Sequence, residues 1–432
     1  MPRNLGPGSA RRFPPLRQWA LDISPLRESV PYRALWLGQI VSLMGTQMRI
    51  LAVSYQVFQL TGSTVAVGLI GLVEVVPLIA FSIIGGALAD RTDRRRLMAQ
   101  MQAGLMVTAA GLAAVSFQEE PSLLAIYVLS AVGAVFQSLD RPARSAIIPS
   151  LVSQDKIPAA LALRQVVFQT TQIAGPFAAG ILIAALGNDV RWVYVIDTFS
   201  FVAALVALRW VPRSIPAAEV DQTPLQSIRE GLRYAWGTPL ILSILTIDLV
   251  AMVFGMPRAA FPELAERTLG LGPAGLGLLY AAPSVGALVA AVSSGWVRNV
   301  TRQGRAVVIA VIVWGAAIAL AGLSVFSVVL VLLFLAIAGA ADVISAIFRG
   351  TILNANTPDF LRGRVNSVNL MVVTGGPRLG DLEAGLAAGV LGAPGSIVFG
   401  GAACLLATRL LTWRLPVLKQ YASSSRVGEE SP

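Results

Sequence analysis

The sequence predicts an all-α integral membrane protein whose twelve transmembrane helices form two six-helix, pseudo-symmetric halves. Roughly a dozen stretches are each about 18 to 26 almost purely apolar residues long, which is the length of a helix that crosses a bilayer. Hydrophobic residues make up 55% of the 432 residues and charged residues only 13%, too few to cover a soluble protein. A single long polar connection also divides the spans six and six, and the two sides share sequence features.

The spans follow one another with short polar connections, and their ends are placed from hydropathy. The first six are expected at 35–58, 65–88, 97–117, 122–139, 159–186 and 192–212. The second six are expected at 238–256, 272–297, 306–325, 327–348, 366–391 and 395–413. Before the first span there are arginines among prolines and polar residues but no apolar core, so we expect no cleavable signal peptide.

The domain organisation follows from the polar connection after the sixth span. Its second part, from Leu225 to Trp236, has the pattern of an amphipathic helix. We therefore expect an N-terminal tail, an N-terminal six-helix bundle, a linker, a C-terminal six-helix bundle and a C-terminal tail. Their boundaries are 1–34, 35–212, 213–237, 238–413 and 414–432.

Positive charge is distributed unevenly between the two sides of this bundle. The net charge is +10, from 33 Lys and Arg residues against 23 Asp and Glu. Apart from cations close to cytosolic span ends, such as Arg164, Arg209 and Arg409, those inside spans or in connections assigned to the outside are Arg49, Arg191, Arg258, Arg267 and Arg378. The others are assigned to the tails, the linker and alternate loops, which by the positive-inside rule places both termini in the cytosol. Topology thus accounts for the charge. We expect membrane lipids, and no nucleic acid, as partners of these cations.

The chemistry-bearing residue types exclude several classes of protein. There is no histidine, and Cys404, in the last span, is the only cysteine, so histidine catalysis, a zinc site and a disulfide are excluded. Lys156 and Lys419 are the only lysines and neither lies in a Walker-type phosphate loop, which excludes an ATP-driven pump. No nucleophile and base are paired in the sequence. We expect neither an enzyme nor a cofactor or metal.

Two sequence features of the first half are repeated in the second half. Arg164 is followed by Pro176 in an AGP step, and Arg364 by Pro377 in a GGP step, each near the start of the fifth span of its half. The segment GGALADRTDRRR after the second span is echoed by SSGWVRNVTRQGR after the eighth. Duplicated halves are the architecture of secondary transporters, in which the substrate site lies near the midplane between them.

Residues 86–95, GALADRTDRR, resemble the signature between helices two and three of the major facilitator superfamily, with Asp93 where the usual pattern has glycine. Further similarity, in RALWLGQIVSLMG, PSLLAIY, DRPARSAIIPSLV and TPDFLRGRVNSVN, is to the drug and siderophore exporter branch that includes the bacterial enterobactin exporter. This resemblance implies the major facilitator fold and a place in the bacterial cytoplasmic (inner) membrane. It also implies proton-coupled export of a siderophore or another amphiphilic small molecule.

The resemblance of residues 86–95 to the superfamily signature also implies a gate on the cytoplasmic side. By resemblance, Asp90 would contact the start of span 366–391 when this gate is closed, while the arginines face anionic headgroups and acids. The gate residues implied are Gly86, Asp90, Arg91, Arg94, Arg95, Arg141 and Arg144. The alternative for the arginines is that they only fix the topology.

Charges inside the spans are candidates for proton coupling or substrate contact, because an unpaired ion at the bilayer centre costs about 3 kcal/mol or more. Arg49 and Glu74 lie at depths where they could meet, and protonating Glu74 would then release Arg49. Asp248 and Asp342 are lone acids in apolar spans, where burial favours a neutral carboxyl. The alternative is that all four only stabilise helix packing. Asp197 is a weaker candidate, since its proximity to the end of its span suggests an interfacial position.

Span 366–391 carries the densest polar group, GGPRLGDLEAG. Arg378 and Asp381 share a helix face whereas Glu383 projects away, so one acid can pair with Arg378 while the other stays free. The glycines and Pro377 predict a locally weakened helix, as in discontinuous helices at transporter sites. The alternative is a packing seam in which small residues let helices approach closely.

The segment Gly175, Pro176 to Gly180 resembles a shortened form of the antiporter signature GPxxGG, with Ile181 in place of the last glycine. It implies export and a helix bend at this step, with Gly376 and Pro377 as the counterpart in the second half. Gly-Pro steps also occur in other membrane helices. Aromatic residues that could line a cavity are Tyr55, Phe58, Phe136, Phe168, Phe254 and Tyr280.

Together these features predict a proton-coupled exporter (antiporter) of a small amphiphilic molecule, with a siderophore of the enterobactin type as the first choice. The mixed cations and acids of the spans suit an anionic siderophore but also admit a cationic drug, so multidrug or macrolide efflux is the alternative. The alternative outside transport is a membrane sensor or an intramembrane enzyme. The expected partners are the substrate, protons and lipids, with the proton gradient as energy source and a monomer as functional unit.

Overall fold

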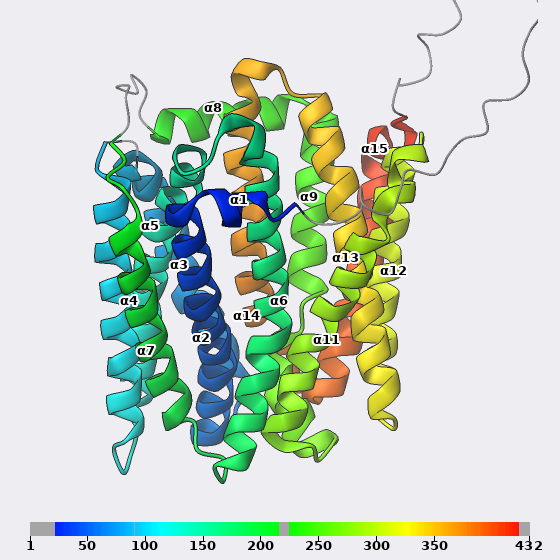
Figure 1. The fold of residues 1–432 in the computed structure, drawn as a ribbon. Coiled ribbons are helices and arrows are strands. Elements are labelled where there is room, and N and C mark those ends of the chain that lie inside the picture. Colours follow the sequence, from blue (N-terminus) through cyan, green and yellow to red (C-terminus); the bar gives the residue numbers. More distant parts are fainter. Residues whose placement is uncertain (1–21, 90, 216–223, 423–432) are drawn as a thin grey trace, which may run out of the picture.

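The computed structural model describes residues 22–89, 91–215 and 224–422, and all regular secondary structure in these ranges is helical (Figure 1). In the first half the helices are α1 (Ser24–Glu28), α2 (Val30–Thr61), α3 (Thr64–Ala89), α4 (Arg94–Ser116), α5 (Leu123–Ile147), α6 (Ile157–Ala185) and α7 (Arg191–Ala207). From the linker onwards they are α8 (Pro224–Gly237), α9 (Pro239–Phe254), α10 (Phe261–Glu263), α11 (Gly272–Val292), α12 (Gln303–Leu323), α13 (Val328–Ala355), α14 (Asp359–Arg414) and α15 (Val417–Gln420).

The twelve expected spans are present among the described residues. Ten segments are long and apolar enough to cross a membrane. One of them, α14, consists of two helices joined at Gly392, whose φ of 71° is not helical. The more polar α2, with 32 residues, is the remaining long helix. The chain is therefore a multi-pass membrane protein with the predicted number of crossings.

Local sequence explains where several helices begin and end. At the start of α2, the Ser29 hydroxyl accepts a hydrogen bond of 3.1 Å from the Tyr32 amide, and Pro31 occupies the first turn. The helix ends at Gly62, whose φ of 61° is left-handed. Asp93 caps α4, since its carboxylate accepts from the Arg95 amide at 3.0 Å. Asp93 thus has a structural role at the position where the family pattern has glycine.

Helices of the two halves pack in the same pattern. In the first half, α3 packs on α5, α4 on α5 and α7, and α2 on α6 and α7. In the second half, α11 packs on α13, α12 on α13 and α14, and α9 on α14. These pairings correspond when α9, α11, α12 and α13 take the places of α2, α3, α4 and α5, and the two parts of α14 take the places of α6 and α7. The packing bears out the two pseudo-symmetric six-helix halves.

The halves meet along two helix pairs, α3 with α14 and α6 with α11. Glycines allow both contacts: a Cβ added at Gly68 would lie 3.0 Å from the Gly385 Cα, and one at Gly180 would lie 2.5 Å from the Pro273 carbonyl oxygen. Thr64 reinforces the first contact, because its hydroxyl donates to the Gly385 carbonyl at 3.1 Å. Small residues therefore hold the two halves in backbone contact, as in other membrane helix pairs.

The linker helix α8 lies across one end of the bundle, which we call the linker end; α15 lies there too (Figure 1). The α8 helix packs on α3, α9 and α14. Glu230 of α8 forms an ion pair with Arg364 of α14, and the Tyr234 hydroxyl donates to the Asn356 carbonyl at 3.1 Å. The amphipathic helix expected between Leu225 and Trp236 is therefore confirmed.

Three predicted span ends are wrong, and in each case polar residues hid the continuation. The fourth span does not end at 139 but continues as a helix to Ile147. The seventh span does not end at 256: after a break at Gly255 to Pro257 it continues through short helical turns to Thr268. Arg258 and Arg267 therefore lie within it. The tenth span continues past 348 to Ala355, so that Arg349, assigned by sequence to a loop, lies inside the helix with only 4% of its surface exposed.

Candidate functional site

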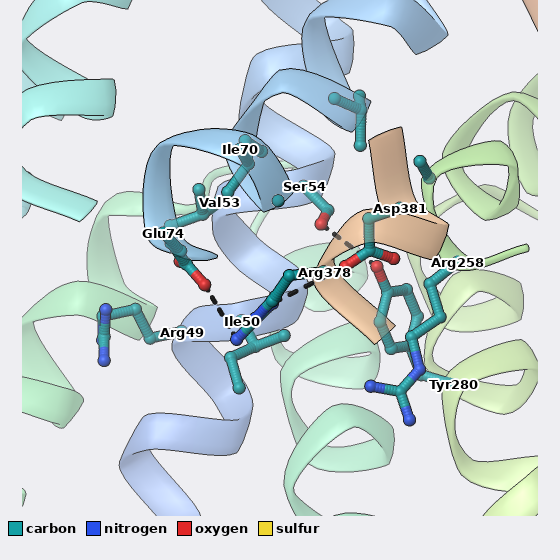
Figure 2. Close-up of a pocket in the computed structure, with 13 residues that line it drawn as sticks. Arg49, Ile50, Val53, Ser54, Ile70, Glu74, Arg258, Tyr280, Arg378 and Asp381 are labelled. Carbon is teal, nitrogen blue, oxygen red and sulfur yellow. Dashed lines mark hydrogen bonds and ion pairs between the residues drawn. The ribbon is translucent and has the colours of Figure 1, made fainter. Parts of the chain in front are cut away.

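A polar pocket lies between the two halves, with α2 and α3 on one side and α11, α14 and the break after α9 on the other (Figure 2). Its charged lining comprises Arg49, Glu74, Arg258, Arg378 and Asp381. Ser54 and Tyr280 complete the polar part, and the Tyr280 and Ser54 hydroxyls are 3.0 Å apart, joining α11 to α2. The remaining lining is small or apolar. We call it the central pocket.

Arg378 lies at the centre of this site. Its Nη2 is 2.8 Å from Glu74 Oε2 on α3, and its Nη1 is 3.7 Å from Asp381 Oδ2 one turn further along α14. The shared helix face predicted for Arg378 and Asp381 is confirmed. The contact with Glu74 crosses between the halves, next to Gly71, where an added Cβ would lie 2.8 Å from the Asp381 side chain. One guanidinium thus holds two carboxylates from two halves.

Arg49 does not pair with Glu74, contrary to the sequence prediction. Arg49 Nε lies 2.9 Å from Asp197 Oδ2 on α7, and this pair is almost completely shielded from solvent. Asp197 is fully buried rather than interfacial. Both Arg49 and Glu74 do face the central pocket, so the depth that the sequence suggested is right and the pairing is wrong. The reason is packing: α2 lies against α7, which places Asp197 beside Arg49.

Asp248 and Asp342 are not lone acids. Both face Arg349 of α13: its Nη2 is 2.7 Å from Asp248 Oδ1 and 3.8 Å from Asp342 Oδ1. The Ser345 hydroxyl lies 2.6 Å from the same guanidinium. This cluster lies inside the second half, and the predicted span end at 348 leaves out its arginine, which is the next residue. Asp342 also lines a second, mostly apolar pocket together with Arg258, Phe261 and Trp314.

Glu383 lies outside both pocket linings. Among the described residues, it makes no ion pair, and its Oε1 is buried without a hydrogen-bond partner. The sequence prediction that one of the two acids stays apart from Arg378 therefore agrees with the structure.

Most of the predicted gate residues lie at the linker end, but Asp90 is outside the described residues. Arg94 donates to the Ala146 carbonyl at 3.0 Å and so ties α4 to the end of α5. Arg144 pairs with Asp140 of its own helix at 2.8 Å. Arg141 donates to Gln137 Oε1 at 3.1 Å. Of the others, Gly86 is in the last turns of α3, Arg91 is exposed just after it, and Arg95 is in the first turn of α4.

The predicted bend positions lie in unbroken helices. The α6 helix runs through Gly175 and Pro176 to Ala185, and α14 runs through Gly376 and Pro377 until Gly392. The local weakening predicted for span 366–391 does not interrupt α14 before Gly392, and the interrupted span is instead the seventh, which breaks after α9. The glycines serve close packing: an added Cβ at Gly376 would lie 2.8 Å from Met252 Cβ. The glycines of span 366–391 thus form a packing seam, while Arg378 and Asp381 of the same span line the central pocket.

Sequence reasoning missed three site residues, Asp197, Arg258 and Arg349, as partners or lining groups. Arg349 could have been found by extending its apolar run by one turn beyond 348. Arg258 follows Gly255 and Pro257, a pair that signals a helix break. The Asp197 contact with Arg49 carries no local signal. Of the six candidate aromatic residues, Tyr280 lines the central pocket.

Comparisons with known proteins agree with the fold. A sequence profile described as transmembrane secretion effector matches residues 20–431. The chain is 28% identical over 352 residues to the enterobactin exporter EntS of Shigella boydii serotype 18, which covers 82% of this chain and 84% of the exporter. The same figures hold for the enterobactin exporter EntS of Escherichia coli O1:K1.

Solved structures share the fold at low identity. A bacterial homologue of the iron transporter ferroportin, in an inward-facing state, superposes with a TM-score of 0.70 and 16% identity, covering 90% of this chain and 98% of that one. A bacterial homologue of the human lysosomal transporter Spinster, also inward-facing, gives 0.66 and 14% identity, over 92% of this chain and 97% of that one.

Proposed function

The chain belongs to the transmembrane secretion effector family of the major facilitator superfamily, and from this membership we propose that it is a proton-coupled exporter of a small amphiphilic molecule. It works by alternating access in the bacterial inner membrane, with both termini in the cytosol. It is a transporter and not an enzyme, in keeping with its family. The enterobactin exporters among its relatives make a siderophore of that type the first substrate class to test.

The observation that carries the proposal is the contact of Glu74 and Asp381 with the single guanidinium of Arg378 between the halves. Alternating access requires that the halves move against each other, so a charge pair across their interface changes with the motion. A proton bound by Glu74 removes its charge, while Arg378 keeps Asp381 as its partner. Proton binding therefore weakens the link between the halves without leaving an unpaired arginine in the membrane.

The positions of the contacts between the halves support an entrance on the linker side. Gly68 with Gly385, Gly180 with Gly277, and Arg267 over the Phe58 ring at 4.9 Å all lie towards the end opposite the linker. The positive-inside rule puts the linker end in the cytosol. With its opposite end packed shut, the molecule accepts substrate from the cytosol, which is the loading state of an exporter.

Efflux of a cationic drug is the second candidate, and the two carboxylates of the central pocket favour it. Everted membrane vesicles decide between the candidates. An inside-acid gradient is followed with a pH-sensitive dye while iron-free siderophores and amphiphilic drugs are added in turn. We expect a siderophore to collapse the gradient through the wild-type protein and at least tenfold more slowly through Glu74→Gln. Glu28→Gln, which removes an exposed partner of Lys156, is the matched control.

Collapse by drugs alone would replace the siderophore by a drug substrate. No response to any compound, with the protein shown to be folded by its thermal unfolding, would contradict proton-coupled export of these classes. A wild-type response that Glu74→Gln leaves unchanged would remove Glu74 from the coupling step.

A further inference from the structure

Arg258 lies at the break in the seventh spanning segment. The α9 helix ends at Phe254, and Gly255 to Pro257 separate it from the short helical turns that begin at Arg258. One carbonyl group freed by this break has a side-chain partner, since Trp314 Nε1 donates to the buried Gly255 carbonyl at 3.0 Å. Irregular backbone at membrane depth is tolerated where it lines a cavity or is buried in protein. The break thus brings a charged side chain to a cavity wall.

Arg258 is the one residue shared by the linings of the two described pockets. It borders the central pocket beside Tyr280, on the side away from Arg49 (Figure 2). It also borders the second pocket, where its neighbours are Phe261 and Trp314. Arg258 therefore lies where a ligand in either pocket would meet it.

Every other charged residue in the two linings has a partner of opposite charge. Arg49 pairs with Asp197, and Arg378 pairs with Glu74 and Asp381. Asp342 is 3.8 Å from Arg349. Within the described part of the chain, no carboxylate lies within 4.0 Å of the Arg258 guanidinium, and no side-chain hydrogen bond holds it. The charge of Arg258 acts on Asp381 and Asp342 only from beyond ion-pair distance. A half-buried arginine at membrane depth with no carboxylate in contact is costly, and a ligand carboxylate would supply that contact.

The surroundings of Arg258 are aromatic. Phe261 and Tyr280 meet edge to face with their ring centres 5.5 Å apart. Trp314, Pro283 and Ile318 continue the apolar wall of the second pocket. Planar rings pack well against such walls, and the planar guanidinium binds a carboxylate through two parallel hydrogen bonds.

We propose that Arg258 is the anchor for the carboxylate of an aromatic acid, whose ring lies against Phe261 and Trp314 in the second pocket. This assignment rests on the proposed export function, because it names the substrate group that the transporter recognises. It adds a binding residue at the helix break to the charged groups of the central pocket. A carboxylate there gives Arg258 the ion pair that the protein does not supply.

The test compares a catechol acid with its neutral isostere, 2,3-dihydroxybenzoate with 2,3-dihydroxybenzamide. Binding to the full-length protein in lipid nanodiscs is measured by calorimetry, and quenching of the Trp314 fluorescence, isolated by subtraction of Trp314→Phe, locates the ring. We expect the acid to bind at least tenfold more tightly than the amide. Arg258→Gln should lower acid affinity at least tenfold and change amide affinity less than twofold.

Two further variants keep the test decisive. Arg258→Lys retains the charge but cannot form the two parallel hydrogen bonds of a guanidinium, so it should keep a reduced preference for the acid. Arg305→Gln removes an exposed arginine at the start of α12 and should behave as wild type. Equal wild-type affinity for acid and amide, no wild-type binding of either, or an equal loss of both in Arg258→Gln would overturn the assignment.

Failure of the assignment is distinguishable from failure of the export function. If the wild-type protein moves protons in response to a substrate in vesicles and Arg258→Gln keeps the acid preference, only the Arg258 assignment is wrong. If the wild-type protein moves no protons with any substrate, the export function itself is wrong.

Discussion

Glu74 in the first half and Arg378 in the second half form an ion pair of 2.8 Å across the interface between the halves. The same guanidinium also faces Asp381 of its own helix. Glu74 and Asp381 therefore both have Arg378 as their ion-pair partner. The same arginine stabilises the pocket and links the two halves.

Removing Arg378 should leave two carboxylates unpaired inside the membrane. We expect Arg378→Met to lower the free energy of unfolding by about 3–5 kcal/mol, the usual effect of breaking a buried charge pair from one side. Adding Glu74→Gln and Asp381→Asn should recover most of this loss. Thermal unfolding in detergent, with Arg305→Met as the exposed control, measures both effects. An Arg378→Met protein as stable as wild type would contradict the pairing.

The corrected partner of Arg49 can be tested by two double-mutant cycles. The cycle between Arg49→Met and Asp197→Leu should show a coupling energy of about 1–3 kcal/mol, as for contacting residues. The cycle between Arg49→Met and Glu74→Gln should give less than about 0.5 kcal/mol, the limit for independent sites. Unfolding in a denaturant series provides the energies. The opposite ranking of the two cycles would restore the pairing of Arg49 with Glu74.

Gly180 should control how tightly the halves close at the end opposite the linker. A Cβ there would lie 2.5 Å from the Pro273 carbonyl oxygen, so Gly180→Ala must push α6 and α11 apart. We expect a cysteine placed at Ser54, in a Cys404→Ala background, to react at least threefold faster with a membrane-impermeant maleimide. Gly350→Ala is the control, because an added Cβ there meets nothing within 4 Å. Equal labelling of both proteins would argue against this closure.

The ion pair between Glu230 and Arg364 should hold α8 in place and contribute little to global stability. Both side chains are partly exposed, and such pairs contribute about 0–1 kcal/mol. We expect Glu230→Gln to shift the unfolding temperature by less than about 3 °C while protease cleavage within 213–237 becomes faster. Raising the salt concentration should have the same effect on the wild-type protein, since salt screens partly exposed pairs. Unchanged cleavage would show that packing alone positions α8.

The sequence predicts the framework of this protein well because membrane crossing is a local property. The length and hydropathy of each span determine whether it forms a helix, and the polar connection at 213–237 separates the halves. Helical geometry even predicts that Arg378 and Asp381 lie on the same face of their helix. The predictions fail where charged residues lie inside a crossing: Arg258 and Arg349 lowered the apparent hydropathy, so the spans around them were ended early.

The partners of charged residues are a different matter, because they depend on contacts between distant helices. Nothing near Arg49 indicates that α7 will place Asp197 beside it, and Glu74 was the nearest acid along the chain at a suitable depth. The lone-acid interpretation of Asp248 and Asp342 fails for the same reason. A span periodicity specifies which face is polar, whereas the arrangement of the bundle specifies which polar faces meet.

The turn at Gly392 has a mechanical consequence. The two parts of α14 are joined by one non-helical residue, and the Ser396 hydroxyl donates to the Ala384 carbonyl at 2.9 Å across this hairpin. A connection this short has no slack. Any tilt of the part that carries Arg378 and Asp381 is therefore transmitted to the last helix of the bundle. The two parts of α14 move together and pivot near Gly392, at the end opposite the linker.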